Sequence, residues 1–236
     1  MNILIIMLPF VGTVLGTLST FFIKKDSIKL KQITVGFSSG IMLVVTFLSL
    51  IIPAVDLIKN TTNIWFPIIF GLLLGIFIIL SLDLIINKNR SNSALIIVIA
   101  IILHNIPEGL ATGVSLAGTV SNYINFNESF LLSLAITLHN IPEGIVVAMN
   151  SKNKKDAIKY GILSGIVEPI SAFFTFLVTQ KISFLMPYML TFAGGAMIYV
   201  ICDELIPESK NKNNKLGVIG VSIGIVIMLL LELIFG

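Results

Sequence analysis

Two stretches of this chain decide its fold: ALIIVIAIILHNIPEGLATGVSL at residues 94–116 and FLLSLAITLHNIPEGIVVAM at residues 130–149. Each is an apolar run long enough to cross a bilayer as a helix, because one crossing takes about 20 residues. Each also holds the same polar hexapeptide, HNIPEG, near its middle. A charged residue at that depth costs about 2.5–3.5 kcal/mol on insertion scales, so the hexapeptides indicate a functional site.

The rest of the chain also has the composition of a membrane protein. Of its 236 residues 56% are hydrophobic and 11% are charged, whereas a soluble domain has about 25% charged residues. Apolar runs between polar breaks predict an all-α polytopic membrane protein with eight transmembrane helices and one transmembrane domain, residues 1–236. The predicted spans are Ile3–Ile23, Ile33–Leu57, Ile64–Ile86, Ala94–Leu116, Phe130–Met149, Ile158–Thr179, Phe184–Ile206 and Leu216–Phe235.

Basic residues predict how these spans are oriented. Nearly all of the 15 lysines and arginines lie in the first, third, fifth and seventh connections, and the other loops hold Lys59 and Lys181. By the positive-inside rule the odd-numbered connections are cytoplasmic and both termini are extracellular. The net charge of +3 therefore reflects topology, and no nucleic-acid partner is expected. The lysine-rich connections contain Lys24, Lys25, Lys29, Lys31, Lys88, Arg90, Lys152, Lys154, Lys155, Lys159, Lys210, Lys212 and Lys215.

The repeated hexapeptide predicts internal symmetry. Its two copies, His104–Gly109 and His139–Gly144, lie in consecutive spans, which run antiparallel. Such a pair is typical of a pseudo-twofold axis in the membrane plane, as in transporters with inverted repeats. A weaker echo joins the second and seventh spans: GIM at 40–42 precedes IIP at 51–53, and GAM at 195–197 precedes LIP at 205–207. We therefore expect a 3+2+3 inverted-repeat bundle.

Helix geometry predicts that each hexapeptide presents a ligand set. With about 100° per residue, Asn falls about 100° and Glu about 40° from His, so the carboxylate lies between imidazole and amide on one face. Two opposed faces can hold two ions that share the carboxylates. Mixed nitrogen and oxygen ligands suit zinc, and also iron, manganese or cadmium. The predicted metal ligands are His104, Asn105, Glu108, His139, Asn140 and Glu143.

Two further residues are candidates for the same site. Glu168, followed by Pro169 in SGIVEP, lies near the centre of the sixth span, where a lone carboxylate needs a cation or a proton. Met42, in the middle of the second span, offers a thioether that either binds metal or only packs. Other polar residues either line the ion path or stabilise helix packing and helix ends: Asp56, Asp83, Thr112, Ser115, Ser133, Asp203 and Glu204.

These motifs resemble those of the ZIP family of divalent metal transporters. Both HNIPEG strings match that family's paired motifs, SGIVEP matches its sixth-helix Glu-Pro element, and the resemblance covers essentially the whole chain. It implies one metal site of His104, Glu108, His139 and Glu143, which Met42 approaches in some members. It also implies a second site, completed by Asn105, Asn140 and Glu168, that shares the two glutamates. Zinc uptake into the cytoplasm and homodimers are further implications.

Three functions remain open at the level of the sequence. The leading one is a transporter of the plasma membrane, in contact with lipid, whose substrate is a divalent metal ion and which has no organic cofactor. An intramembrane metalloenzyme is the second, although the ligand set leaves no obvious open position and no HExxH motif is present. A metal sensor that transports nothing is the third. The duplicated, proline-broken helices favour transport, because a structural site needs no broken helix.

Overall fold

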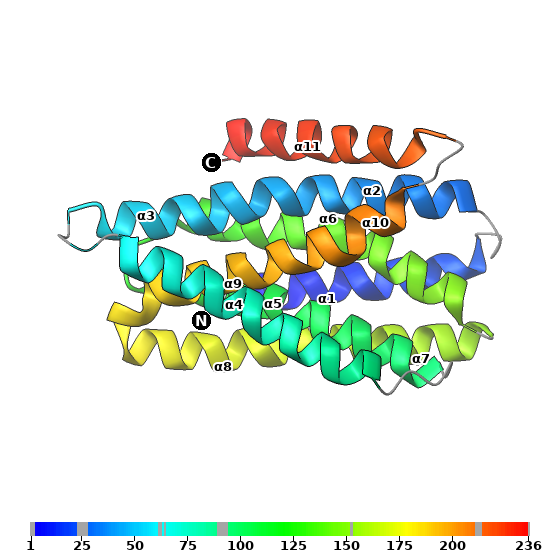
Figure 1. Cartoon of the computed structure of the whole chain (residues 1–236), viewed down its shortest axis with the longest axis horizontal. Coiled ribbons are helices and arrows are strands. Elements are labelled where there is room, and N and C mark those ends of the chain that lie inside the picture. Colours follow the sequence, from blue (N-terminus) through cyan, green and yellow to red (C-terminus); the bar gives the residue numbers. More distant parts are fainter. Residues whose placement is uncertain are drawn as a thin grey trace.

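The computed structural model describes residues 3–22, 28–60, 63, 65–88, 94–151, 153–210 and 214–235, and its elements in these ranges are helical (Figure 1). The α-helices are α1 (Ile3–Leu18), α2 (Ile28–Val45), α3 (Ile52–Ile58), α4 (Trp65–Lys88), α5 (Ala94–Val120), α6 (Phe126–Asn150), α7 (Lys154–Gly165), α8 (Val167–Lys181), α9 (Met186–Val200), α10 (Ile206–Ser209) and α11 (Leu216–Phe235). The short turns are η1 (Ser19–Phe21), η2 (Thr46–Ile51), η3 (Ser183–Leu185) and η4 (Ile201–Leu205).

Several of these helices join into longer rods. The π-helical turn η2 connects α2 to α3, η4 connects α9 to α10, and α7 runs into α8. Within the described residues, six rods are long and apolar enough to cross a membrane: Ile28–Ile58, Trp65–Ile85, Phe126–Asn150, Lys154–Lys181, Met186–Ser209 and Leu216–Phe235. The helix Ile3–Leu18 is apolar but shorter. α5 contains the predicted fourth span, although the side chains of 94–101 lie outside the description.

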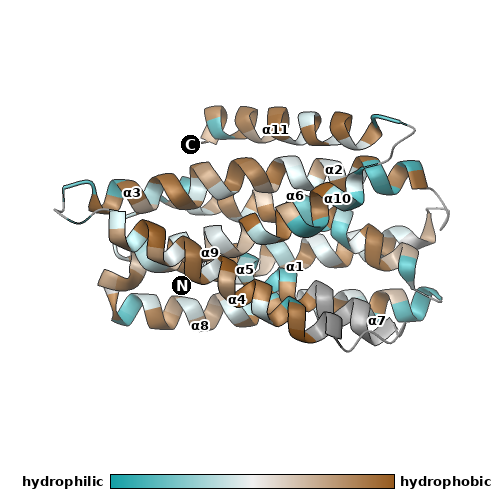
Figure 2. Ribbon diagram, in the orientation of Figure 1, coloured by the Kyte–Doolittle hydropathy of each residue, from teal (hydrophilic) through white to brown (hydrophobic). Residues whose placement is uncertain are grey.

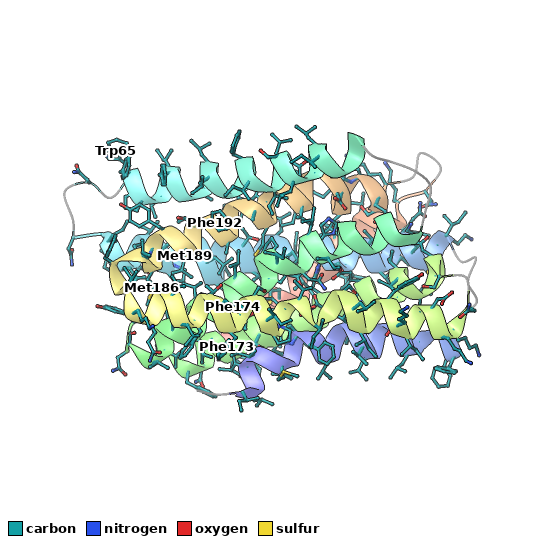
Figure 3. The ribbon with its side chains drawn as sticks, turned by 90° about the horizontal axis from the view of Figure 1, so that it is seen from below. Trp65, Phe173, Phe174, Met186, Met189 and Phe192 are labelled. Carbon is teal, nitrogen blue, oxygen red and sulfur yellow. The ribbon has the colours of Figure 1, made fainter. Side chains whose placement is uncertain are left out.

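Polar residues gather at the two ends of the bundle, and hydrophobic residues line the helices between them (Figure 2). The described helix ends beside the four lysine-rich connections lie at the right of Figure 1. Trp65 points away from the bundle at the opposite end, where α4 begins (Figure 3). Five of the basic residues used for the orientation, and the side chain of Lys88, lie outside the described residues: Lys24, Lys25, Arg90, Lys152 and Lys212.

The connection between α5 and α6 is shorter than the sequence predicts. The predicted spans Ala94–Leu116 and Phe130–Met149 leave residues 117–129 between them, yet α5 continues to Val120 and α6 begins at Phe126. Asn125 starts α6 with a capping box, since its side chain and that of Glu128 satisfy backbone N–H groups reciprocally. Asn122 has a positive φ of 59°, which asparagine tolerates better than most residues, and so allows the tight turn.

Glycines let four pairs of helices pack backbone to backbone. The most extensive packing joins α1 to α6, α5 to α8, α2 to α11 and α4 to α9. A Cβ added at Gly16 of α1 would collide with the Ile141 carbonyl, and one at Gly40 of α2 with the Val221 carbonyl. Close approach at small residues is the usual way that membrane helices associate, because lipid gives no hydrophobic drive between them.

Proline breaks in the helices are compensated by other groups. Pro9 in α1 has no N–H, so the carbonyl of Ile5 loses its helical partner. Ser133 of α6 donates to that carbonyl at 2.6 Å. Pro53 and Pro207 each follow directly after a π-helical turn, η2 or η4, in the second and seventh predicted spans. The two segments related by the weak sequence echo thus share the same local irregularity.

Candidate metal centre

Three side chains from α5 and α6 converge inside the bundle. One ligand atom each from Glu108, His139 and Glu143 lies within 4.8 Å of the other two. His139 Nε2 is 3.0 Å from Glu108 Oε1, and the two side chains are 3% and 2% exposed. His139 and Glu143 are four residues apart on one helix, so they share a face, as the sequence predicts. The cluster has two carboxylates and one imidazole, a donor set typical of zinc sites.

The backbone of α2 fixes the imidazole of His139. Its Nδ1 is 3.3 Å from the carbonyl oxygen of Ser38, and Ser38 Oγ donates to the carbonyl of His139 at 3.0 Å. Because a carbonyl can only accept, Nδ1 carries the proton of this contact. The contact of Nε2 with Glu108 Oε1 then holds one proton, on the ring or on the carboxyl group, and loss of that proton leaves Nε2 as an acceptor beside the carboxylates, which is the usual arrangement of a metal-binding histidine.

His104 makes its hydrogen bond outside this cluster. Its Nε2 is 2.8 Å from Glu204 Oε1 of η4, and the two side chains are 13% and 30% exposed. The sequence predicts His104 as a ligand beside His139 and leaves the role of Glu204 open. The structure pairs His104 with Glu204, so this contact joins α5 to the seventh predicted span, and the role of His104 as a ligand stays a prediction.

The two asparagines and Glu168 form a second polar layer. Asn105 Nδ2 donates to Glu168 Oε1 at 3.0 Å, and Asn140 Nδ2 donates to Glu168 Oε2 at 2.8 Å. Thr13 Oγ1 of α1 donates to Glu168 Oε1 at 2.9 Å. All four side chains are buried. Glu168, predicted as a metal ligand, thus contacts the predicted amide ligands directly.

Five oxygens of this site are buried and have no hydrogen-bond partner among the residues that the structure describes: Asn105 Oδ1, Glu108 Oε2, Asn140 Oδ1, Glu143 Oε1 and Glu143 Oε2. All five are acceptors, and buried polar atoms in proteins are normally paired. An unpaired buried acceptor is stabilised by a cation, and these oxygens belong to four of the predicted ligands. The site can therefore bind a positive ion with the oxygen atoms that are already present.

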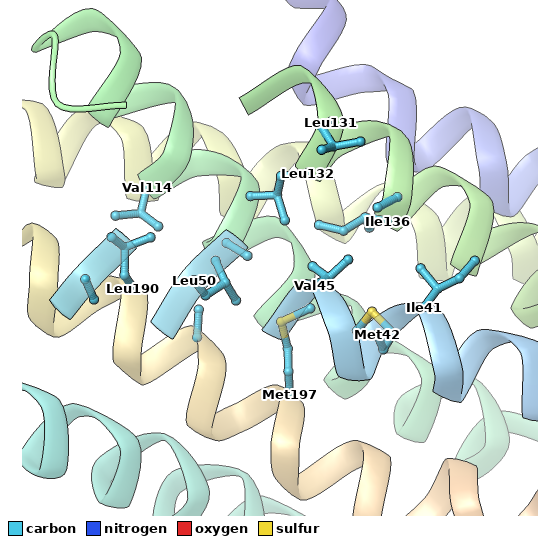
Figure 4. Packing of buried hydrophobic residues seen from close by; sticks show 14 of the residues in the cluster. Ile41, Met42, Val45, Leu50, Val114, Leu131, Leu132, Ile136, Leu190 and Met197 are labelled. Atoms are coloured by element: carbon cyan, nitrogen blue, oxygen red, sulfur yellow. The ribbon is translucent and has the colours of Figure 1, made fainter. Parts of the chain in front are cut away.

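Met42 lies in the buried apolar cluster beside Ile41 and Val45 (Figure 4). Its role as a thioether ligand stays a prediction. The polar residues flanking the motifs are hydrogen-bonded: Thr112 to the carbonyl of Glu108, and Ser115 to Ser129. Together with Ser133, which donates to Ile5, they stabilise the helices, as the simpler of the two interpretations predicts.

Two residues with contacts to the site were missed at the level of the sequence, Thr13 and Ser38. A hydroxyl within a strongly apolar span was the available signal for Thr13. Ser38 acts on His139 through its backbone as well as its hydroxyl, which no sequence pattern reveals.

Comparison with known proteins identifies the family of this chain. The sequence profile described as ZIP zinc transporter matches residues 87–232. The chain is 34% identical to the zinc transporter GufA of Myxococcus xanthus, over 95% of both chains. This chain belongs to the ZIP family. It is also 31% identical to the zinc transporter ZupT of Chlorobaculum parvum, over 95% of this chain and 93% of that one. This ZIP protein is thus a multi-pass membrane protein of a transporter family rather than an enzyme family, and its resemblance to the bacterial members is confirmed.

Proposed function

We propose that this ZIP protein transports divalent transition-metal ions, zinc first among them, across the plasma membrane into the cytoplasm. The observation that carries the proposal is the set of five buried acceptor oxygens without partners. A bundle whose interior keeps such oxygens unpaired has a site that a cation completes. The relatives are named zinc transporters, which supports zinc as the substrate.

The proposed site has two ion positions that share two carboxylates. The first position lies at Glu108, His139 and Glu143, which already converge. His104 joins it by leaving Glu204, and Met42 is its proposed soft neighbour. The second position lies at the carbonyl oxygens of Asn105 and Asn140 and at Glu168, whose carboxylate also accepts from both amide groups. Iron, manganese and cadmium suit the same nitrogen and oxygen donors.

Helix packing supports alternating access in a 3+2+3 inverted-repeat bundle of eight spans. The α1–α6 and α5–α8 pairs contain the close contacts of Gly16 and Gly113, and they carry every proposed ligand except Met42. The α2–α11 and α4–α9 pairs contain those of Gly40 and Gly75. In such a repeat, spans one, two and three correspond to spans six, seven and eight, and span four corresponds to span five. This exchange maps the α1–α6 pair onto the α5–α8 pair, and the α2–α11 pair onto the α4–α9 pair.

The two groups of helices meet at a buried apolar cluster and at two polar contacts. Ser38 with His139 and His104 with Glu204 join them through polar atoms, and none of the glycine contacts named above lies between the groups. We infer that the first group slides or rocks against the second, and that the ligands move with it. A change at the metal site can drive this motion, because both polar contacts involve a histidine of the hexapeptides.

Burial supports release toward the end that carries the lysine-rich connections. On the opposite side of the site, Val45, Leu50, Leu132 and Ile136 form an apolar layer with no exposed surface (Figure 4). On the lysine-rich side, the Glu204 and Glu208 side chains are 30% and 38% exposed. Since the positive-inside rule predicts that this end is cytoplasmic, these exposures support release of the ion into the cytoplasm.

Uptake of radioactive zinc by proteoliposomes tests the proposal. We expect saturable uptake by the native protein, none by Glu143→Ala, and near-native uptake by Glu208→Gln, whose partly exposed ion pair with Lys31 includes none of the proposed ligands. Zinc-dependent thermal stability without uptake would instead favour the sensor. Chemical cross-linking in the membrane tests the homodimer that we also propose, since dimers double the mass of the labelled band.

A further inference from the structure

We propose that Thr13 is a positioning residue, which acts through Glu168 to keep the carbonyl oxygens of Asn105 and Asn140 turned toward the metal. The inference rests on the proposed function, because it concerns the second ion position of the same site. Thr13 lies in α1, outside both hexapeptides, and its side chain is fully buried.

Hydrogen bonds fix the orientation of the two amide groups. Asn105 Nδ2 donates to the Ser164 carbonyl at 3.1 Å and to Glu168 at 3.0 Å. Asn140 Nδ2 donates to the Pro9 carbonyl at 3.2 Å and to Glu168 at 2.8 Å. Both hydrogens of each amide are used, so each Oδ1 must face the other way, and both Oδ1 atoms are unpaired. A flipped amide would bring its oxygen against a carbonyl and a carboxylate, which repel it.

Both amides share the carboxylate of Glu168 as an acceptor. Glu168 can hold them only while one of its oxygens faces each asparagine. A cation at the second position attracts that carboxylate as a ligand, and if Glu168 swung away from the asparagines as it bound the ion, one of the amides would lose its acceptor. Thr13 Oγ1 donates to Oε1 at 2.9 Å, the same oxygen that Asn105 uses. This bond ties Glu168 to α1 and opposes the rotation.

The two helices that supply these groups place them in the same register. The Pro9 carbonyl accepts from Asn140, and Thr13 stands four residues later. The Ser164 carbonyl accepts from Asn105, and Glu168 stands four residues later. Thr13 therefore occupies, in the first predicted span, the place that Glu168 occupies in the sixth.

This register explains why a neutral donor stands at position 13. A second carboxylate there would face Glu168 within hydrogen-bonding distance, and the two like charges would repel each other at a buried position. A hydroxyl instead donates to Glu168 and leaves one carboxylate to hold both amides. Because Thr13 is neutral where the sixth predicted span has Glu168, the centre has three carboxylates, those of Glu108, Glu143 and Glu168.

The test compares three isosteric or conservative variants of α1. Thr13→Val removes only the hydroxyl, and Thr13→Ser restores it. Thr17→Val is the matched control, because Thr17 is equally buried and its hydroxyl donates, within the described part of the chain, to the Val14 carbonyl of its own helix. Loss of a residue that orients a metal ligand costs about 10–100-fold in metal affinity.

Calorimetric zinc titration of the purified proteins gives the readout. We expect the weaker of two zinc equivalents to lose about 10–100-fold in affinity in Thr13→Val, and to keep native affinity in Thr13→Ser and Thr17→Val. We also expect Thr13→Val to have no further effect in a Glu168→Gln background, because Thr13 acts through Glu168. Thr13→Ala repeats the comparison with a smaller side chain if the valine variant does not fold.

Native zinc affinity in both Thr13→Val and Thr13→Ala would overturn the inference, as would equal losses in Thr17→Val or failure of Thr13→Ser to restore binding. Binding is measured apart from transport. Native protein that binds zinc with the expected Thr13 dependence but moves none in proteoliposomes would refute the proposed function and leave this inference standing. Native protein that binds no divalent ion would refute both.

Discussion

Replacement of Glu143 by glutamine should change stability and zinc affinity in opposite directions. Glu143 is buried beside Glu108, with ligand atoms no more than 4.8 Å apart, and neither of its oxygens has a hydrogen-bond partner. At an effective dielectric constant of about 20, two ionised carboxylates at that separation repel by about 3 kcal/mol. Glutamine has the same shape, removes one charge and supplies an N–H₂ donor to Glu108.

The metal-free variant should therefore be more stable than the native protein by about 1–3 kcal/mol, less than the full repulsion because His139 already offsets part of it. For a chain of this size, that gain raises the melting temperature by roughly 2–10 °C. Added zinc should stabilise the native protein more than the variant. At 100 times its dissociation constant it stabilises native protein by about 2.7 kcal/mol, and a 100-fold weaker affinity would remove nearly all of that shift in the variant.

Thermal unfolding in detergent, with chelator and with added zinc, measures both effects on the same samples. Glu208→Gln is the control, because a half-exposed ion pair contributes only about 0–1 kcal/mol, and it should keep the zinc-dependent shift. A Glu143→Gln protein that melts below the native protein with chelator, or that keeps the full zinc shift, would refute our account of the cluster.

Two further predictions concern packing and orientation. Gly195→Ala should lower the free energy of unfolding by about 1–3 kcal/mol through overpacking, because the added Cβ would meet the Leu72 carbonyl. Gly194→Ala, whose Cβ meets only side chains, should change it little. Equal melting temperatures of the two variants would contradict this prediction. In a background without the native cysteine, an impermeant maleimide should label Asn60→Cys in right-side-out vesicles and Asn150→Cys only in inside-out vesicles, since both positions are exposed at opposite ends. The reverse pattern would invert the predicted topology.

Much of the candidate site could be predicted from local sequence. His139 and Glu143 share a face because they are four residues apart on a helix, and that relation needs no tertiary information. The repeated hexapeptide also predicts that α5 and α6 face each other, and Glu108 with His139 confirms it. The all-helical fold follows from apolar runs of bilayer length, because a lipid-exposed backbone must satisfy its own hydrogen bonds.

Other contacts could not be predicted, because they depend on how separate spans are placed. The sequence groups His104 with His139, yet His104 pairs with Glu204, a residue 100 positions away. Nothing local relates Thr13 to Glu168, or the backbone of Ser38 to the imidazole of His139. Each of these pairs forms where helices from different parts of the chain approach closely.

The sequence by itself thus determined the class of fold, the family and most of the ligand types, because periodicity, charge and hydropathy act within one helix or one connection. Only the tertiary structure decided which oxygens stay unpaired, which carboxylate holds the amides and where His104 points. The physical reason is that a buried polar atom is satisfied by whichever donor reaches it, and in this bundle that donor often lies on a helix distant in sequence.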